Sequence, residues 1–305
     1  MPDQTAALAA LTPERAGRER FDPFPYLLVL PALLILAVVF LYPLAYSLWL
    51  SFFNLNLNRP GRGMPFVGFG NYEQVLTDPD FYHALWLTVY WSVGSVAGQV
   101  LLGMAAALAL NETFPGRAIA RAVILVPWAV PTVLVAIVFN TMFNSQGIIN
   151  QLLLDAHIVN DYIPWLSSSR LSMPTIIIAN VWKGFPFVAV MLLAGLQGIP
   201  GELYEAAKMD GATDIEQFRF ITLPSLRPVM AVTVLLSIIF SLKSVDFQYI
   251  MTYGGPADST KVVAFEAYYT AFGEFLFGKA SAIATILTLI TAAISYLYLK
   301  QRGAE

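Results

Sequence analysis

The sequence predicts an all-α integral membrane protein with six transmembrane helices. Of its 305 residues, 57% are hydrophobic and only 12% are charged, and the mean hydropathy is +0.65. Soluble globular chains carry about 25% charged residues. The chain also contains six stretches of the ~20 mainly apolar residues that a spanning helix needs. Composition and segment length therefore agree on the fold class.

The six expected spans cover residues 26–53, 84–110, 118–143, 172–197, 229–250 and 276–299. The first apolar run is longer than the 7–15 residues of a signal-peptide core, so we expect an uncleaved span. Pro127 and Pro131 interrupt the third span, and we expect a kink there because neighbouring groups can satisfy the freed carbonyls. The predicted organisation is a tail (1–25), a first helix (26–53) and a core (54–305) with five helices.

The distribution of basic residues predicts that both termini are cytoplasmic. With that orientation the inner segments hold ten Lys and Arg residues and the outer segments hold five, as the positive-inside rule requires. The inner ones are Arg15, Arg18, Arg20, Arg117, Arg121, Lys208, Arg219, Arg227, Lys300 and Arg302, and the outer ones are Arg59, Arg62, Arg170, Lys261 and Lys279.

Composition and motifs exclude several functions. A formal net charge of -3 gives no basic surplus for a nucleic-acid partner, and the absence of Cys excludes thiolate ligands and a Cys nucleophile. The stretch GEFLFGKAS (273–281) is one residue short of a phosphate-binding loop, because Ala280 stands where Ser or Thr would reach Mg²⁺. We therefore expect no enzymatic activity and no metal or cofactor bound by this chain.

The loop from 198 to 228 has a pattern of its own. Strong helix formers follow Gly201 in ELYEAAKM, and Asp210 with Gly211 supplies a stop and turn. A second short helix is expected over 214–220, before Leu223 and Pro224 return the chain to the membrane. The residues alone leave two interpretations open: a simple connector on the membrane surface, or a small-residue surface that a partner approaches closely.

The spacing in this loop resembles the EAA motif of permeases in binding-protein-dependent ABC importers. The matching residues are Glu205, Ala206, Ala207, Gly211, Ile221, Leu223 and Pro224, with Asp210 in the turn. The resemblance implies a type I ABC importer permease fold and a coupling helix that binds a cytoplasmic ATPase subunit. It also implies a second, non-identical permease subunit, two ATP-binding subunits that carry ATP and Mg²⁺, and an extracytoplasmic solute-binding protein.

Three further segments are similar to the carbohydrate branch of this family: VWKGFPFVAVMLLAGLQGIP (181–200), MTYGGPADST (251–260) and FGKASA (277–282). The resemblance implies a multi-pass protein of a bacterial or archaeal cytoplasmic membrane that imports a sugar or sugar derivative. An amino-acid or polyamine importer is the nearer alternative, and a self-contained secondary transporter is the more distant one.

Polar residues inside the spans mark a candidate substrate pathway. Ionisable groups there cost about 2.5 to 3.5 kcal/mol each, so each needs a partner or a water-filled cavity. Lys243 and Asp246 are three residues apart, which would allow an ion pair on one helix. Lys183 either lines the pathway or makes a structural pair, and as a pathway residue it would suit an anionic sugar.

Ser237, Phe240, Ser241 and Ser244 follow the spacing of one helix face, a mixture of hydroxyls and a ring that suits sugars as well as helix packing. Aligned on the Gly-Gly-Pro segment, these residues match positions that line the sugar site of maltose-type permeases. Four residues of the fourth span match likewise: Asn180, Lys183, Gly184 and Phe187.

Overall fold

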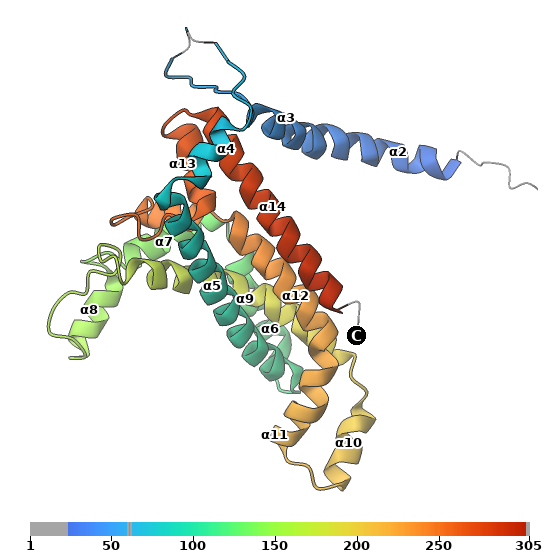
Figure 1. Cartoon of the computed structure of the whole chain (residues 1–305). Helices are drawn as coiled ribbons and strands as arrows, with labels where there is room; N and C mark the ends of the chain where they lie inside the picture. Colours follow the sequence, from blue (N-terminus) through green and yellow to red (C-terminus); the bar gives the residue numbers. More distant parts are fainter. Residues whose placement is uncertain (1–23, 60, 62, 303–305) are drawn as a thin grey trace, which may run out of the picture. The chain divides into compact units, whose positions relative to one another are not determined.

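The computed structural model describes residues 24–59, 61 and 63–302, and these residues are almost entirely helical (Figure 1). Within these ranges no β-strand forms, and the only bridges are Phe53–Phe66 and Asn56–Leu276. The chain divides into two compact units, one up to Ser47 and one from Leu48 onward. Most of the predicted tail (1–25) lies outside the described residues, with Arg15, Arg18 and Arg20, and so does Arg62.

The first unit contains most of the first predicted span (26–53). Three consecutive elements, α2 (Phe24–Leu36), the π-helical η2 (Ala37–Leu41) and α3 (Tyr42–Leu50), run from this unit into the start of the second. Together they give an apolar helix of 24 residues, Leu27–Leu50. At 1.5 Å per residue this helix is about 36 Å long, enough to cross a bilayer core of about 30 Å.

Four more spans are confirmed in the second unit: α5 (Pro79–Asn111), α9 (Ser172–Gln197), α12 (Leu223–Lys243) and α14 (Phe277–Arg302). The helix α9 has the predicted bounds. The helix α5 begins earlier than predicted, because the Asp78 carboxylate caps it by accepting a hydrogen bond from the Asp80 main-chain N–H at 3.1 Å. Pro79 at the first helical position also favours this start.

The prediction of a mere kink in the third span was wrong. The helices α6 (Arg117–Ala129) and α7 (Thr132–Met142) form a broken pair with a bend of 90°. Val130 is extended (ψ 134°), as expected for a residue before proline, and Pro131 has no N–H to continue the helix. Among the residues that the structure describes, five helices are thus long enough to span a membrane, and the broken pair can form a sixth span.

The fifth span begins and ends earlier than predicted. The short α11 (Asp214–Gln217) continues without interruption through η4 (Phe218–Thr222) into α12. At the other end α12 stops at Lys243, where Ser244 is extended (ψ 128°), and a separate π-helical element, η5 (Gln248–Thr252), follows. The segment expected as one helix over 229–250 is therefore interrupted after residue 243.

The connecting segments contain helices that the sequence did not predict: α4 (Gly70–Leu76), α8 (Ile148–Asp155) and α13 (Val263–Phe272). In Figure 1, α4 and α13 lie at one end of the second unit, and α10 (Gly201–Met209) and α11 lie at the opposite end. Near α4, α14 begins against the main chain of Phe53, where a Cβ on Gly278 would collide with the Phe53 carbonyl oxygen. This close approach explains the glycine of FGKASA.

Close packing of α5 on α9 forms the centre of the second unit. Glycines of α5 face branched residues of α9: Gly94 faces Ile177, Gly98 faces Val181, and Gly103 faces Val188. Small residues at such positions let two membrane helices approach closely, so that van der Waals contacts hold them together. At Gly103 an added Cβ would lie 2.7 Å from Val188 Cβ and 3.1 Å from the main-chain N of Ala189.

We predict that Gly103→Ala lowers the thermal unfolding midpoint of the purified transporter. Because main-chain atoms of α9 oppose the new methyl group, relief requires moving the helix, at a cost of about 1 to 3 kcal/mol. Gly201→Ala is the matched control, since a Cβ there meets nothing within 4 Å. Both variants gain helix propensity, so equal midpoints for the two would contradict the packing argument.

Candidate functional site

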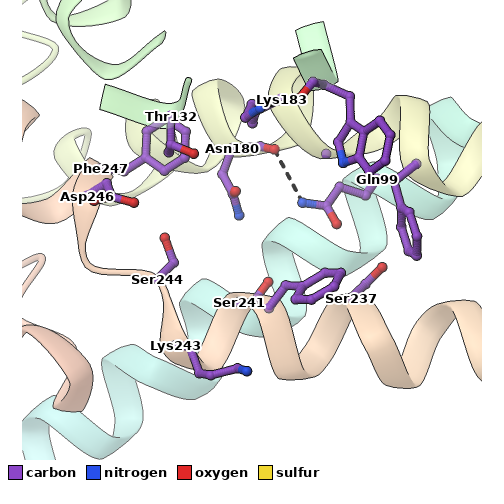
Figure 2. A pocket seen from close by; sticks show the side chains of 14 residues that line it. Gln99, Thr132, Asn180, Lys183, Ser237, Ser241, Lys243, Ser244, Asp246 and Phe247 are labelled. Atoms are coloured by element: carbon purple, nitrogen blue, oxygen red, sulfur yellow. Dashed lines mark hydrogen bonds between the residues drawn. The ribbon is translucent and has the colours of Figure 1, made fainter. Parts of the chain in front are cut away.

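A cavity of about 410 Å³ lies between α9 and α12, with walls completed by α5, α6 and α7 (Figure 2). This volume lies within the ~300 to 1,000 Å³ typical of small-molecule sites. All eight predicted pathway residues line it: Asn180, Lys183, Gly184, Phe187, Ser237, Phe240, Ser241 and Ser244. Ser244 lies beyond the end of α12, so the predicted single helix face holds only for the first three residues of the α12 set.

Four lining residues were missed from the sequence: Gln99, Trp128, Thr132 and Phe247. Gln99 is an amide within an apolar span, and Trp128 and Thr132 each directly follow one of the two prolines of the third span. Those features were visible in the sequence, but nothing in it indicated that these residues face α9. Phe247 follows the break after α12, which the sequence did not predict.

Two polar groups of the cavity have no hydrogen-bond partner among the described residues. The side-chain amide nitrogen of Asn180 and the hydroxyl of Ser237 are both buried and unpaired. Figure 2 shows Asn180 pointing from α9 toward the serines of α12. Because a buried unsatisfied polar group costs about 1 to 3 kcal/mol, these two groups favour a ligand or water that supplies the missing bonds.

Aromatic rings form the other part of the wall. The Phe187 ring lies 6.2 Å from the Trp128 ring and 5.8 Å from the Phe240 ring, the latter pair edge to face. Phe240, in the last turn of α12, remains 55% exposed. An open ring beside unpaired polar groups provides both kinds of contact that an amphipathic ligand requires.

Two side chains connect α9 to its neighbours at the cavity. Gln99 of α5 donates a hydrogen bond to the main-chain oxygen of Asn180 at 3.2 Å, and a Cβ on Gly184 would collide with the Gln99 amide. Lys183 donates to the main-chain oxygens of Trp128 at 2.7 Å and Val130 at 2.6 Å. Lys183 thus lines the cavity and also has structural partners.

The predicted ion pair of Lys243 with Asp246 does not form. Both residues line the cavity, but no salt bridge joins them in the described part of the chain, and Figure 2 shows them pointing in different directions. The prediction assumed one continuous helix, whereas α12 ends at Lys243 and the extended Ser244 separates the two side chains.

The EAA-like segment is an exposed helix with a well-defined turn. None of the residues of α10 is buried. The helix ends in a Schellman turn, in which Gly211 is left-handed (φ +85°) and the N–H groups of Gly211 and Ala212 donate to the oxygens of Lys208 and Ala207. Thr213 and Glu216 then form a capping box at the start of α11.

The motif residues are divided between the helix, its turn and the start of α12. Glu205 and Ala206 are exposed on α10, and Ala207 is half-buried. The others follow: Asp210 and Gly211 in the turn, Ile221 in η4, and Leu223 with Pro224 at the start of α12. The hydroxyls of Tyr204 and Thr222 are 2.9 Å apart and join the two parts of the segment.

A polar cavity among helices long enough to span a membrane, together with an exposed helical segment at one end, is the arrangement expected of a membrane-spanning transporter subunit. Residues 99–302 match the family described as the binding-protein-dependent transport system inner membrane component. This chain belongs to that family, and it is therefore an ABC importer permease. Membership also excludes the alternative of a self-contained secondary transporter.

Relatives and solved structures agree with this assignment. The chain is 39% identical over 276 residues to the trehalose/maltose transport system permease protein of Thermococcus litoralis, covering 89% of this chain and 92% of the relative. It is 34% identical over 275 residues to the sulfoquinovosyl glycerol transport system permease protein of Agrobacterium fabrum, covering 90% and 88%. A bacterial ABC transporter for the acidic polysaccharide alginate has the same fold, with a TM-score of 0.77, 24% identity and coverage of 91% and 94%.

We predict that Gly211→Val destroys the turn after α10, whereas Gly211→Asn preserves it. Asn tolerates the left-handed region, but a β-branched residue there is strained. Hydrogen exchange of the peptide that contains residues 207–212 should accelerate in the Val variant, because the bonds from the Gly211 and Ala212 N–H groups are lost. Equal exchange in the two variants would show that the left-handed conformation is not required.

Proposed function

We propose that this chain is the membrane-spanning subunit of an ATP-driven importer for a sugar or sugar derivative. An extracytoplasmic binding protein delivers the solute, and alternating access of the cavity between α9 and α12 moves it across a bacterial or archaeal cytoplasmic membrane. The sugar assignment depends on one observation: two polar groups without hydrogen-bond partners in the described part of the chain, on Asn180 and Ser237, lie in the same cavity wall as the exposed Phe240 ring. Sugars present hydroxyls at their edges and apolar C–H faces to such a wall.

The relatives support a sugar over an amino acid. Their names specify trehalose or maltose and sulfoquinovosyl glycerol, and each aligns along most of this chain.

ATP hydrolysis belongs to partner subunits in this proposal. Two cytoplasmic ATPase subunits bind ATP and Mg²⁺, and a second, non-identical permease subunit completes the pathway. The segment α10–α11 is the coupling surface, with both termini on the same, cytoplasmic side. Its apolar side chains are open to a partner, since Met209 is 88% exposed, Ile215 78% and Leu203 47%. Such a surface on a short helix matches a groove-binding mode of recognition.

The sugar assignment predicts that Asn180→Ala and Ser237→Ala raise the KM of uptake about 10-fold, the value of one lost hydrogen bond of ~1.4 kcal/mol. Gln99 bonds the main chain of Asn180 and not its side chain, and the Ser237 hydroxyl has no partner among the described residues, so neither variant removes a hydrogen bond that holds the fold. The assay is uptake into proteoliposomes of whichever probe the cognate binding protein retains among trehalose, maltose, sulfoquinovosyl glycerol and histidine. Thr288→Ala is the control, because this exposed hydroxyl bonds only its own helix. Retention of histidine alone would contradict a sugar importer.

The coupling assignment predicts that Glu205→Arg abolishes uptake while the complex still assembles. Reversing this exposed charge on α10 disrupts the contact through which ATP binding closes the permease, so stimulation of the ATPase by the loaded binding protein should fall as well. Glu205→Asp, which keeps the negative charge at the same exposed position, is the control and should retain uptake. Wild-type uptake by the Glu205 variant would remove α10 from coupling.

A further inference from the structure

The break between α6 and α7 leaves main-chain carbonyls without helical donors. In an unbroken helix the Val130 oxygen would accept a hydrogen bond from the N–H of Leu134. Here the Leu134 N–H donates to the Pro131 oxygen instead, at 3.0 Å, and the extended Val130 also ends the helical bonding of Trp128. Each unsatisfied carbonyl at membrane depth costs several kcal/mol. The break therefore requires donors from elsewhere in the fold.

Lys183 of α9 supplies those donors. Its ammonium bonds the Trp128 oxygen at 2.7 Å and the Val130 oxygen at 2.6 Å, although these residues lie 55 and 53 positions away in sequence. A cation is also favoured at this place, because the C-terminal end of α6 carries the negative end of the helix dipole. Two of the three ammonium protons are thereby committed to the backbone.

The same face of α9 also contacts the Trp128 side chain. Phe187 lies four residues after Lys183, which is one helical turn, and its ring is 6.2 Å from the Trp128 indole. Trp128 is thus held twice by α9, through its carbonyl and through its ring. Both Trp128 and Thr132, on either side of the break, line the cavity.

We propose that Lys183 is a positioning residue: its bonds to the α6–α7 break place Trp128 and Thr132 in the wall of the transport cavity, and it does not serve as the receptor for a charge on the solute. This inference rests on the proposed function only in taking the cavity as the solute site. It predicts that the variants rank by their ability to donate hydrogen bonds. A charge receptor would instead rank them by positive charge.

Spin labels on α6 and α7 test, without any solute, whether the hydrogen bonds from Lys183 hold the α6–α7 break in place. The chain has no native Cys, so Ile119→Cys on α6 and Ile137→Cys on α7, which are 71% and 47% exposed, report the bend within the assembled complex. Lys183→Met retains the apolar stem but no donor, so the measured distance distribution should broaden or shift. Lys183→Arg should preserve the wild-type distribution, and Lys183→Gln, which is uncharged but can donate, should lie between Arg and Met.

Lys243→Met is the matched control, because Lys243 lines the same cavity but, in the described part of the chain, no hydrogen bond joins its side chain to the α6–α7 break. It should leave the distance distribution unchanged. If the Lys183→Met distribution also matches the wild type, the positioning role is overturned.

Uptake kinetics provide a second, independent readout. With the solute that the importer carries, Lys183→Met should raise KM at least about 10-fold, and Lys183→Gln should recover part of this loss despite its neutral side chain. Equal loss in Met and Gln, with full activity only in Arg, would identify a charge receptor and overturn the proposal. The spin-label result does not depend on the solute, so failure of the sugar assignment remains distinguishable from failure of the positioning role of Lys183.

Discussion

Inside a bilayer every main-chain N–H and C=O must find a partner within the protein, and this constraint explains where the cavity lies. The described spans are helical except at two interruptions, Val130–Pro131 between α6 and α7 and Ser244–Val245 after α12. Residues beside both interruptions line the same cavity. Irregular backbone at membrane depth is tolerated where it lines a cavity or is buried, so the interruptions and the cavity support each other.

One continuous run of helix leads from α11, in the segment that we propose for coupling, through η4 into α12 and so to the cavity. The motif residues Ile221, Leu223 and Pro224 lie at the start of the segment that continues through α12, and Ser237 and Ser241 lie near its other end. A continuous helix of this kind can carry a displacement of α10 and α11 toward the cavity wall. The hydroxyl contact between Tyr204 and Thr222 fixes α10 to the beginning of that helix. Coupling in the proposed mechanism therefore has a physical path that needs no flexible connection.

The sequence predicted the fourth span to the residue and the family from the EAA-like loop, but it predicted a kink at the first interruption and a continuous helix at the second. Pro127 and Pro131 indicated an irregularity in the third span. A kinked helix and a 90° break can contain the same residues, so composition alone could not distinguish them. In the fifth span the residues from Lys243 to Asp246 carry no breaker that distinguishes an interrupted helix from a continuous one. For that reason the predicted ion pair, which assumed continuity, was wrong.

The sequence by itself determined the apolar segments and the Gly211 turn, because both depend on neighbouring residues: hydrophobic length in one case, a left-handed backbone in the other. It also placed Asn180, Lys183, Ser237 and Phe240 on the right helices. Only the tertiary structure decided what these residues meet. Lys183 reaches carbonyls 53 and 55 residues away, and Gln99 bonds a main-chain oxygen 81 residues away. Such partners depend on how helices pack, and packing is a property of facing surfaces that no local pattern contains.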